Sequence, residues 1–300
     1  MFEGSAVALV TPFLNGVIDE KKLAELVEFQ IDGGTSTLVP CGTTGESATL
    51  SHAEHGRVIE LVIKFARKRV KVLAGAGSNS TAEAVALTRR AKEAGADGAL
   101  HITPYYNKPT PRGLVEHFRA VARAADLPIV LYNVPGRTGV NMLPATVIEL
   151  ARTEKNIVGI KEASGSLDQA TEIAGALGDG FELISGDDSL TLPILSVGGK
   201  GVISVVANIV PKDVSSLCAA GLRGDWAEAR RLHTKLYPLS KAMFVETSPI
   251  PVKTAMGWLD LCSPDLRPPL VPLEKASQDK LEKALRDYGL VSPRRKHPVC

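Results

Sequence analysis

A lysine stands in a largely apolar strand pattern, at Lys161 in the sequence IVGIKEA. Side chains alternate along a strand, which places Lys161 on the same face as Ile157, Gly159 and Ala163. Glu162 then points to the opposite face and is a poor ion-pair partner for the lysine. Burial disfavours the ammonium form, so the free amine becomes available near neutral pH. A lysine at a strand end can instead reach solvent, but the small neighbours favour a nucleophilic amine.

Other polar side chains follow two more strand patterns. Tyr132 lies near the end of one of them, where a buried phenol either packs with a satisfied hydroxyl or transfers protons beside an amine. Arg137 follows between glycines and is either a surface side chain or a clamp for a carboxylate. Thr43 and Thr44 lie between two glycines in a turn whose N–H groups could hold an anion.

The elements that must position these residues alternate along the chain. Eight short β-branched runs are separated by amphipathic stretches with apolar residues at helical spacing. We predict strands at Ala6–Val10, Thr37–Pro40, Val72–Ala74, Gly98–Ile102, Ile129–Asn133, Ile157–Glu162, Glu182–Ser185 and Gly201–Val206. Eight such units are typical of a (β/α)8 TIM barrel, whereas a doubly wound open sheet more often has five or six strands.

The chain changes character after about Trp226. Helical patterns cover 226–245, 250–260 and 274–287, with no further strand pattern. We therefore predict a catalytic barrel over 1–224 and a C-terminal helical extension, or domain, over 225–290. Residues 291–300 are basic and proline-rich, and we expect a disordered tail there.

Composition excludes several classes of protein. With 35 Lys and Arg against 33 Asp and Glu, the chain has no bulk charge that would attract nucleic acid or a membrane surface. No apolar run reaches the roughly 18–20 residues of a membrane span. The four cysteines are far apart and form no paired motif, which favours reduced thiols and a cytoplasmic protein. No zinc-ligand set or nucleotide fingerprint is present, so we expect neither a metal nor a cofactor.

Several unlinked motifs resemble those of the dihydrodipicolinate synthase family, within the pyruvate-dependent class I aldolases that include N-acetylneuraminate lyase. The resemblance covers residues 1 to about 290. Its motifs are GTTGES at 42–47, TPYYN at 103–107, YNVPGRTG at 132–139, GIKEASG at 159–165, SGDD at 185–188, GVISV at 201–205 and PIPVKTA at 249–255. The family fold is a TIM barrel with a C-terminal helical domain, which agrees with the strand count.

The resemblance implies a reaction and a site. Lys161 would form a Schiff base with pyruvate, and the resulting enamine would add to L-aspartate 4-semialdehyde, opening lysine and diaminopimelate biosynthesis without a cofactor. Tyr132 would transfer protons through Thr43 to Tyr106, which in this family reaches in from a neighbouring subunit. The substrate-binding positions implied are Thr44, Arg137, Gly186 and Ile203. The family also implies a homotetramer built from two dimers.

A second set of residues matches the lysine-binding pocket of the inhibitable members of the family. It consists of Ser47, Ala48, His52, His55, Asn79, Glu83 and Tyr105. We expect L-lysine to inhibit from this pocket. Some of these residues also have simpler interpretations. Glu83 could serve merely to close a capping box begun at Ser80, and His52 and His55 could be solvated residues in the first turn of a helix.

Two other functions stay open. A related aldolase could act on a sugar acid such as N-acetylneuraminate or 2-keto-3-deoxygluconate, but Arg137 favours a short carboxylate substrate. A non-catalytic barrel could bind a small acid, yet it would not need a proton relay. Val206 and Ser248 stand where threonine and asparagine are common, and we expect neither to contact the chemistry.

Overall fold

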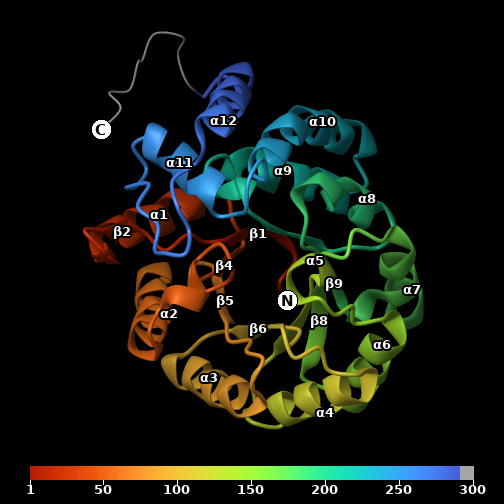
Figure 1. The fold of residues 1–300 in the computed structure, drawn as a ribbon. Helices are drawn as coiled ribbons and strands as arrows, with labels where there is room; N and C mark the ends of the chain where they lie inside the picture. Colours follow the sequence, from red (N-terminus) through yellow and green to blue (C-terminus); the bar gives the residue numbers. More distant parts are fainter. Residues whose placement is uncertain (291–300) are drawn as a thin grey trace.

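The computed structural model describes residues 1–290, so the predicted disordered tail lies outside the described residues. Eight parallel strands close into a barrel in the order β1-β10-β9-β8-β7-β6-β5-β4 (Figure 1). These strands are β1 (Gly4–Ala8), β4 (Thr37–Val39), β5 (Lys71–Gly75), β6 (Gly98–Ile102), β7 (Ile129–Asn133), β8 (Ile157–Glu162), β9 (Glu182–Ser185) and β10 (Gly201–Ser204). The predicted TIM barrel is confirmed, with shifts of one or two residues at the strand ends.

Helices surround the barrel and connect its strands. They are α1 (Glu20–Asp32), α2 (His52–Ala66), α3 (Thr81–Ala94), α4 (Pro111–Ala122), α5 (Pro135–Thr138), α6 (Pro144–Thr153), α7 (Leu167–Leu177), α8 (Thr191–Ser196) and α9 (Pro211–Leu222). Local sequence determines where several of them begin. At α2, Ser51 accepts from the Glu54 N–H and Glu54 accepts from the Ser51 N–H, which is the predicted capping box.

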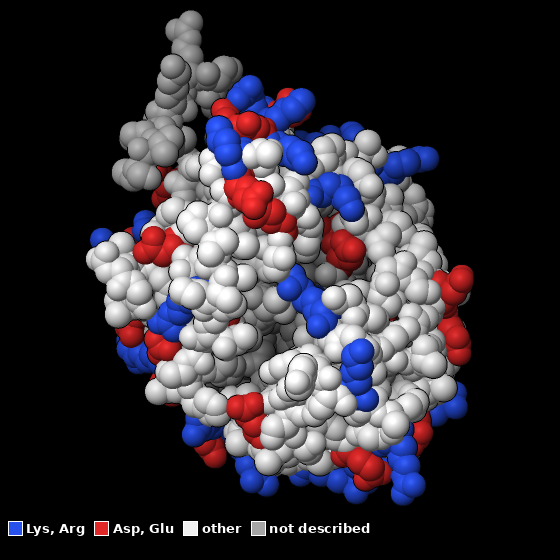
Figure 2. All heavy atoms as spheres, viewed as in Figure 1, with Lys and Arg blue, Asp and Glu red and all other residues white. Residues whose placement is uncertain are grey.

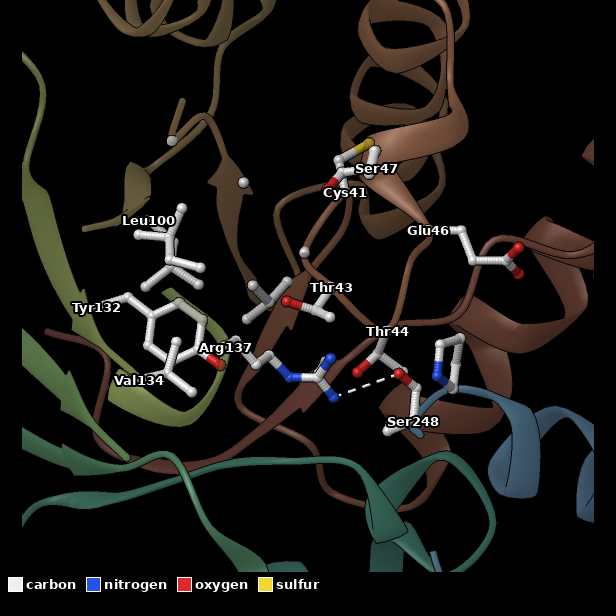
Figure 3. A pocket seen from close by; sticks show the side chains of 18 of the residues that line it. Cys41, Thr43, Thr44, Glu46, Ser47, Leu100, Tyr132, Val134, Arg137 and Ser248 are labelled. Atoms are coloured by element: carbon white, nitrogen blue, oxygen red, sulfur yellow. Dashed lines mark hydrogen bonds between the residues drawn. The ribbon is translucent and has the colours of Figure 1, made fainter. Parts of the chain in front are cut away.

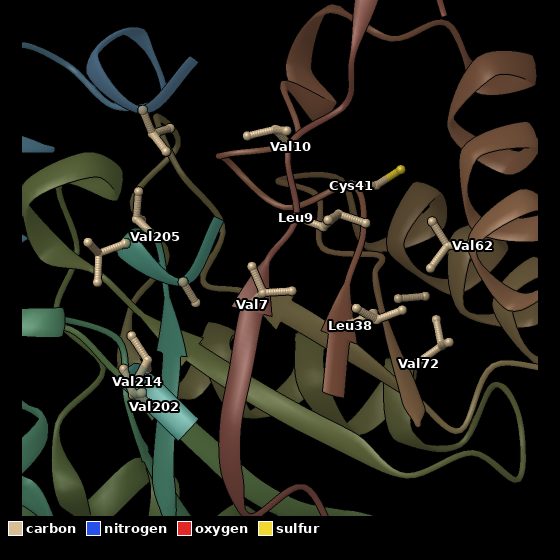
Figure 4. Close-up of a cluster of buried hydrophobic side chains, with 14 of the residues drawn as sticks. Val7, Leu9, Val10, Leu38, Cys41, Val62, Val72, Val202, Val205 and Val214 are labelled. Carbon is tan, nitrogen blue, oxygen red and sulfur yellow. The ribbon is translucent and has the colours of Figure 1, made fainter. Parts of the chain in front are cut away.

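The apolar side chains form two clusters that the strands separate. Alternation sends Val7, Leu38 and Val202 outward, where they pack against the helices (Figure 4). The inward cluster contains Ala6, Val130, Tyr132, Ile184 and Ile203 among others. This second cluster fills the barrel with side chains, as the fold requires, below the end where the strands finish.

The β8 strand departs from simple alternation. Ile129 of β7 pairs with Ile157, but Val130 pairs with Gly159, so Val158 is an extra residue in the ladder. As a result Ile157 packs in the outer cluster and Val158 packs against the inner one. The prediction that Ile157 shares a face with Lys161 was therefore wrong, whereas Lys161 beyond the bulge does point into the barrel.

Three further helices follow the barrel: α10 (Trp226–Ala242), α11 (Ile250–Trp258) and α12 (Lys275–Tyr288). They correspond to the three helical patterns expected there, and α10 packs on α9 and α12 (Figure 1). The sequence did not predict the two-stranded hairpin of β2 (Phe13–Leu14) and β3 (Val17–Ile18), because each strand has only two residues. Within residues 1–290, none of the helices combines the length and apolar character needed to cross a membrane.

Candidate active site

A cavity of about 590 Å³ opens where the barrel strands end. Figure 2 shows this face hollowed near its centre, with Lys or Arg side chains beside the hollow. Residues from both predicted sites line the cavity, namely Thr43, Thr44, Ser47, Ala48, His52, His55, Glu83, Tyr105, Tyr132, Arg137, Lys161 and Gly186. In this single chain the two predicted sites are thus parts of one continuous space.

Lys161 is the buried amine at the base of this cavity. Lys161 is 6% exposed, and it lies opposite Tyr132 in the register of the neighbouring strand β7. The Nζ atom lies 4.3 Å from the centroid of the Tyr132 ring. Burial lowers the pKa of Lys161 to about 8, while Asp188 is the charge that most opposes this shift. A substantial share of the amine is therefore unprotonated at neutral to mildly alkaline pH, as a nucleophile requires.

Tyr132 stands beside the amine as a largely neutral phenol. Burial raises the pKa of Tyr132 to about 12, and the positive charge of Arg137 and a hydrogen bond with Thr43 act in the other direction. The hydroxyl can therefore give and take back a proton without staying ionised. Figure 3 shows Thr43, Thr44, Tyr132 and Arg137 around the same opening.

Arg137 extends across the cavity from the short helix α5. Its Nη2 donates to the Ser248 carbonyl oxygen at 3.3 Å, and Ser248 itself lines the cavity (Figure 3). Ser248, which we expected not to contact the chemistry, thus lines the cavity and holds Arg137 through its carbonyl oxygen. The segment after α10 folds back over the barrel mouth, which no local pattern indicates.

The position of Gly186 has no room for a side chain. A Cβ atom there would lie 2.6 Å from the Ala163 Cβ and 3.1 Å from the Lys161 Cε. Any larger residue would therefore push against the lysine side chain. Ile203 is 1% exposed in the inner cluster and supports the floor of the site.

Tyr106 is the one predicted catalytic residue that the single chain does not bring to the cavity. It is 89% exposed and adopts a left-handed φ of 73°. Its N–H donates to the Thr138 carbonyl at 3.4 Å, so the backbone is held while the ring points away. Tyr105 does line the cavity.

The residues of the predicted lysine pocket, apart from Asn79, line the side of the cavity near α2 and α3. His52 Nε2 lies 2.9 Å from Glu83 Oε1, and Ser78 also donates to Glu83. Ser80 caps α3, but the Glu83 carboxylate does not return to complete a capping box. The Glu83 carboxylate is held by His52 and Ser78 instead, and the residue lines the cavity.

His55 and Asn79 complete this group in different ways. His55 is buried, and its pKa is lowered by desolvation although a hydrogen bond to the Gly75 backbone raises it. It is therefore not a solvated first-turn residue. Asn79 does not line the cavity, but its Nδ2 donates to the Tyr105 carbonyl at 3.2 Å and so holds the loop that does.

Comparison with known proteins agrees with this site. The sequence profile of the Dihydrodipicolinate synthetase family matches residues 1–288. The chain belongs to this family. A curated 4-hydroxy-tetrahydrodipicolinate synthase from Citrifermentans bemidjiense is 58% identical over 291 residues, covering 97% of this chain and 100% of the relative.

Solved structures of the family have the same fold as this chain. The dihydrodipicolinate synthase of Acinetobacter baumannii, described as chloride inhibited and complexed with pyruvate, superposes with a TM-score of 0.95 at 45% identity over 97% of this chain and 100% of that one. The DHDPS of Cyanidioschyzon merolae with lysine bound has a TM-score of 0.94 at 42% identity, covering 97% and 99%.

An ion pair that sequence reasoning missed links two of the family motifs. Glu46, from GTTGES, and Lys253, from PIPVKTA, are fully buried with 2.7 Å between Oε1 and Nζ. Lys253 also donates to the Thr11 carbonyl at 3.0 Å, and Glu46 accepts from the Arg267 N–H at 3.0 Å. This ion pair attaches the turn that contains Thr43 and Thr44 to the C-terminal helices.

Proposed function

We propose that the chain catalyses the Schiff-base condensation of pyruvate with L-aspartate 4-semialdehyde to 4-hydroxy-tetrahydrodipicolinate. The observation that carries this proposal is the buried Lys161 beside Tyr132, with a pKa of about 8, at the base of an open cavity. A binding protein would not need a desolvated amine against a phenol. The Citrifermentans bemidjiense relative, at 58% identity, is named 4-hydroxy-tetrahydrodipicolinate synthase after this reaction, which supports the same conclusion.

The chemistry follows from the groups present and needs no cofactor. The Lys161 amine attacks the keto carbon of pyruvate, a proton passes to the oxygen, and water leaves to give an iminium ion. Loss of a proton from the pyruvate methyl group forms the neutral enamine, which attacks the aldehyde carbon. The amino group of the semialdehyde then displaces Lys161 as the ring closes, which returns the free amine.

Each neighbouring residue has a role in this sequence. Tyr132 lies close enough to Lys161 to move protons to and from the reacting oxygen, and Thr43 orients it. Thr44, at the glycine-rich turn, would hold the pyruvate carboxylate. Arg137 would bind the carboxylate of the semialdehyde, with its guanidinium held by Ser248.

Reductive trapping tests the assignment. Pyruvate with cyanoborohydride should add one reduced pyruvyl group to the peptide that contains Lys161, and Lys161→Ala should remain folded but lose turnover by several orders of magnitude. Coupled assays should show product from aspartate semialdehyde and none from N-acetylneuraminate or 2-keto-3-deoxygluconate. An adduct on a different lysine, with Lys161→Ala still active, would overturn the proposal.

The active unit in this proposal contains more than one chain. Tyr106 is exposed in the single chain, and its backbone is held so that the ring projects from the barrel mouth. In a dimer this ring would enter the neighbouring cavity and extend the relay of Thr43 and Tyr132. A homotetramer made of two such dimers fits the family, and the unpaired cysteines among residues 1–290 fit a reducing cytoplasm.

L-Lysine is the proposed inhibitor. Glu83 offers a carboxylate within the cavity, and Asn79 positions Tyr105 beside it. These groups would bind the α-amino and carboxylate ends of lysine, and the histidines with the Ser47–Ala48 backbone would surround the ε-ammonium. Tyr105 adjoins Tyr106, so a bound lysine would disturb the proton relay and couple the two sites by about 1–3 kcal/mol.

A further inference from the structure

Asn133 and Glu162 form a buried polar pair beside the proposed catalytic pair of Tyr132 and Lys161. Each follows a catalytic residue in its strand, and the register that places Tyr132 opposite Lys161 also places Asn133 opposite Glu162. Side chains alternate between the two faces of a strand, so Asn133 and Glu162 point outward, toward the helices. Both are buried, and neither lines the cavity. Their polar groups therefore do not serve to bind substrate.

The Asn133 amide connects the two strands to each other and to a neighbouring loop. Its Nδ2 donates to Glu162 Oε2 at 3.1 Å and to Asn141 Oδ1 at 2.8 Å. Its Oδ1 accepts from the Met142 N–H at 2.9 Å. Glu162 Oε1 accepts from the Ser164 N–H at 2.5 Å, which holds the loop after β8.

These contacts belong to a closed ring of hydrogen bonds. Asn141 Nδ2 donates to Gln169 Oε1 at 3.1 Å, and Gln169 Nε2 donates to Ser164 Oγ at 3.0 Å. The ring therefore runs from Asn133 through Asn141, Gln169 and Ser164 to Glu162 and back to Asn133. A buried polar network in which each member is satisfied makes its surroundings rigid. The ring thus fixes the ends of β7 and β8, the loop before α6 and the start of α7 relative to one another.

The ring lies at the ends of the two strands that carry the catalytic pair. β7 ends at Asn133 and β8 ends at Glu162, and the Ala163 N–H donates to the Asn133 carbonyl at 2.9 Å at this end of the ladder. Lys161 Nζ lies 4.3 Å from the centroid of the Tyr132 ring, and no hydrogen bond joins these two side chains within residues 1–290. Their separation therefore depends on how their backbones are held.

We propose that Asn133, acting through Glu162, is a positioning residue that holds Tyr132 and Lys161 at the separation that proton transfer needs. This inference rests on the proposed function and deepens it. After the amine adds to the keto carbon, the Tyr132 hydroxyl gives its proton to the hydroxyl group of that adduct. Water then leaves, the nitrogen lone pair forms the C=N bond of the iminium, and the phenolate takes back a proton before the next turnover. A displacement of about 1 Å can slow such a step about a hundredfold.

The experiment measures the rate of iminium formation in the full chain. Pyruvate is mixed with the protein, the reaction is quenched with borohydride at millisecond intervals, and mass spectrometry gives the fraction that carries the reduced adduct. The rate is compared well above the Lys161 pKa of about 8, where the amine is unprotonated in every variant. In Glu162→Gln one acceptor oxygen faces two donors, Asn133 Nδ2 and the Ser164 N–H, so the rate should fall about ten- to a hundredfold.

Further variants separate position from charge. Asn133→Ala removes the donor and keeps the Glu162 charge, and it should slow iminium formation by a similar factor. Adding Asn133→Asp to Glu162→Gln exchanges the carboxylate and the amide, so the bond between the strands can form in the reverse direction and most of the native rate should return. Glu154→Gln is the matched control: it makes the same change to a buried carboxylate before β8, held by Arg119 and Arg123, and it should keep the native rate.

The possible results lead to different conclusions. A folded Glu162→Gln or Asn133→Ala protein with the native rate would overturn the inference. An equal loss of rate in Glu154→Gln, or no recovery in the double variant, would also overturn it. A native chain that forms no adduct at Lys161 would instead overturn the proposed function.

Discussion

Replacing Lys253 with methionine tests whether the buried ion pair holds the catalytic turn. The substitution keeps the length of the side chain and removes the ammonium, so Glu46 keeps a charge at a position with no exposed side-chain surface. Removing one partner of a buried pair costs about 3–5 kcal/mol. The Arg267 N–H still donates to Glu46, so we expect a loss of unfolding free energy at the lower end of this range, about 3 kcal/mol.

That loss converts to a measurable change in melting temperature. In a protein of this size each kcal/mol of lost unfolding free energy lowers the melting temperature by about 2–4 °C. The melting temperature of Lys253→Met should therefore fall by about 6–12 °C. Lys275→Met is the control, because Lys275 and Asp279 form an ion pair with side chains 80% and 62% exposed. Its melting temperature should stay close to the native value, because an ion pair between exposed side chains contributes little to stability.

Two further measurements separate the pair from general damage. Adding Glu46→Gln to Lys253→Met should recover part of the stability, since no unpaired buried charge then remains. The pyruvate KM of Lys253→Met should also rise, because Glu46 has a left-handed φ of 54° and closes the turn that carries Thr44. A melting temperature within about 2 °C of the native value, in a folded Lys253→Met protein, would refute this reasoning.

Three other predictions concern assembly, regulation and acid stability. Mixing inactive Lys161→Ala and Tyr106→Phe proteins should restore activity when subunits exchange, since a hybrid dimer contains one intact site; verified hybrids without activity would contradict a shared relay. Glu83→Ala should relieve inhibition by millimolar lysine while keeping uninhibited turnover, and an unchanged inhibition curve would remove Glu83 from the pocket. Burial lowers the pKa of His101 to about 3 and of His117 to about 4, so the unfolded chain binds protons that the folded chain does not as pH falls below about 6.5. The melting temperature should therefore drop between pH 6.5 and 4, and His101→Gln should reduce that slope; equal slopes would exclude this cause.

The barrel was predictable because its signals are local. Each strand has a β-branched run, each helix has a matching apolar face, and Ser51 with Glu54 forms a cap that four residues specify. Lys161 was identifiable for a related reason, since a charged residue in a strand buried on both faces conflicts with its surroundings.

Contacts between distant segments were not predictable. Glu46 and Lys253 are 207 positions apart, and Arg137 is 111 positions from the Ser248 carbonyl that holds it. Glu83 is instructive because its spacing from Ser80 fits a capping box, yet its carboxylate is directed to His52 instead. A local pattern gives the contacts that a residue can make within its own helix, but partners brought by the fold can be stronger.

The bulge in β8 separates the lower part of that strand from its catalytic part. Val158 is the extra residue in the ladder between Ile157 and Lys161. Ile157 packs against the surrounding helices, whereas Lys161 faces the cavity. Insertions or deletions below the bulge can therefore be compensated there, without rotating the amine out of the site. An amine nucleophile grafted onto another barrel is therefore best placed by counting residues back from the carboxyl end of the strand. Counting alternate residues from the beginning of the strand would place the amine on the wrong face, because the bulge reverses the alternation.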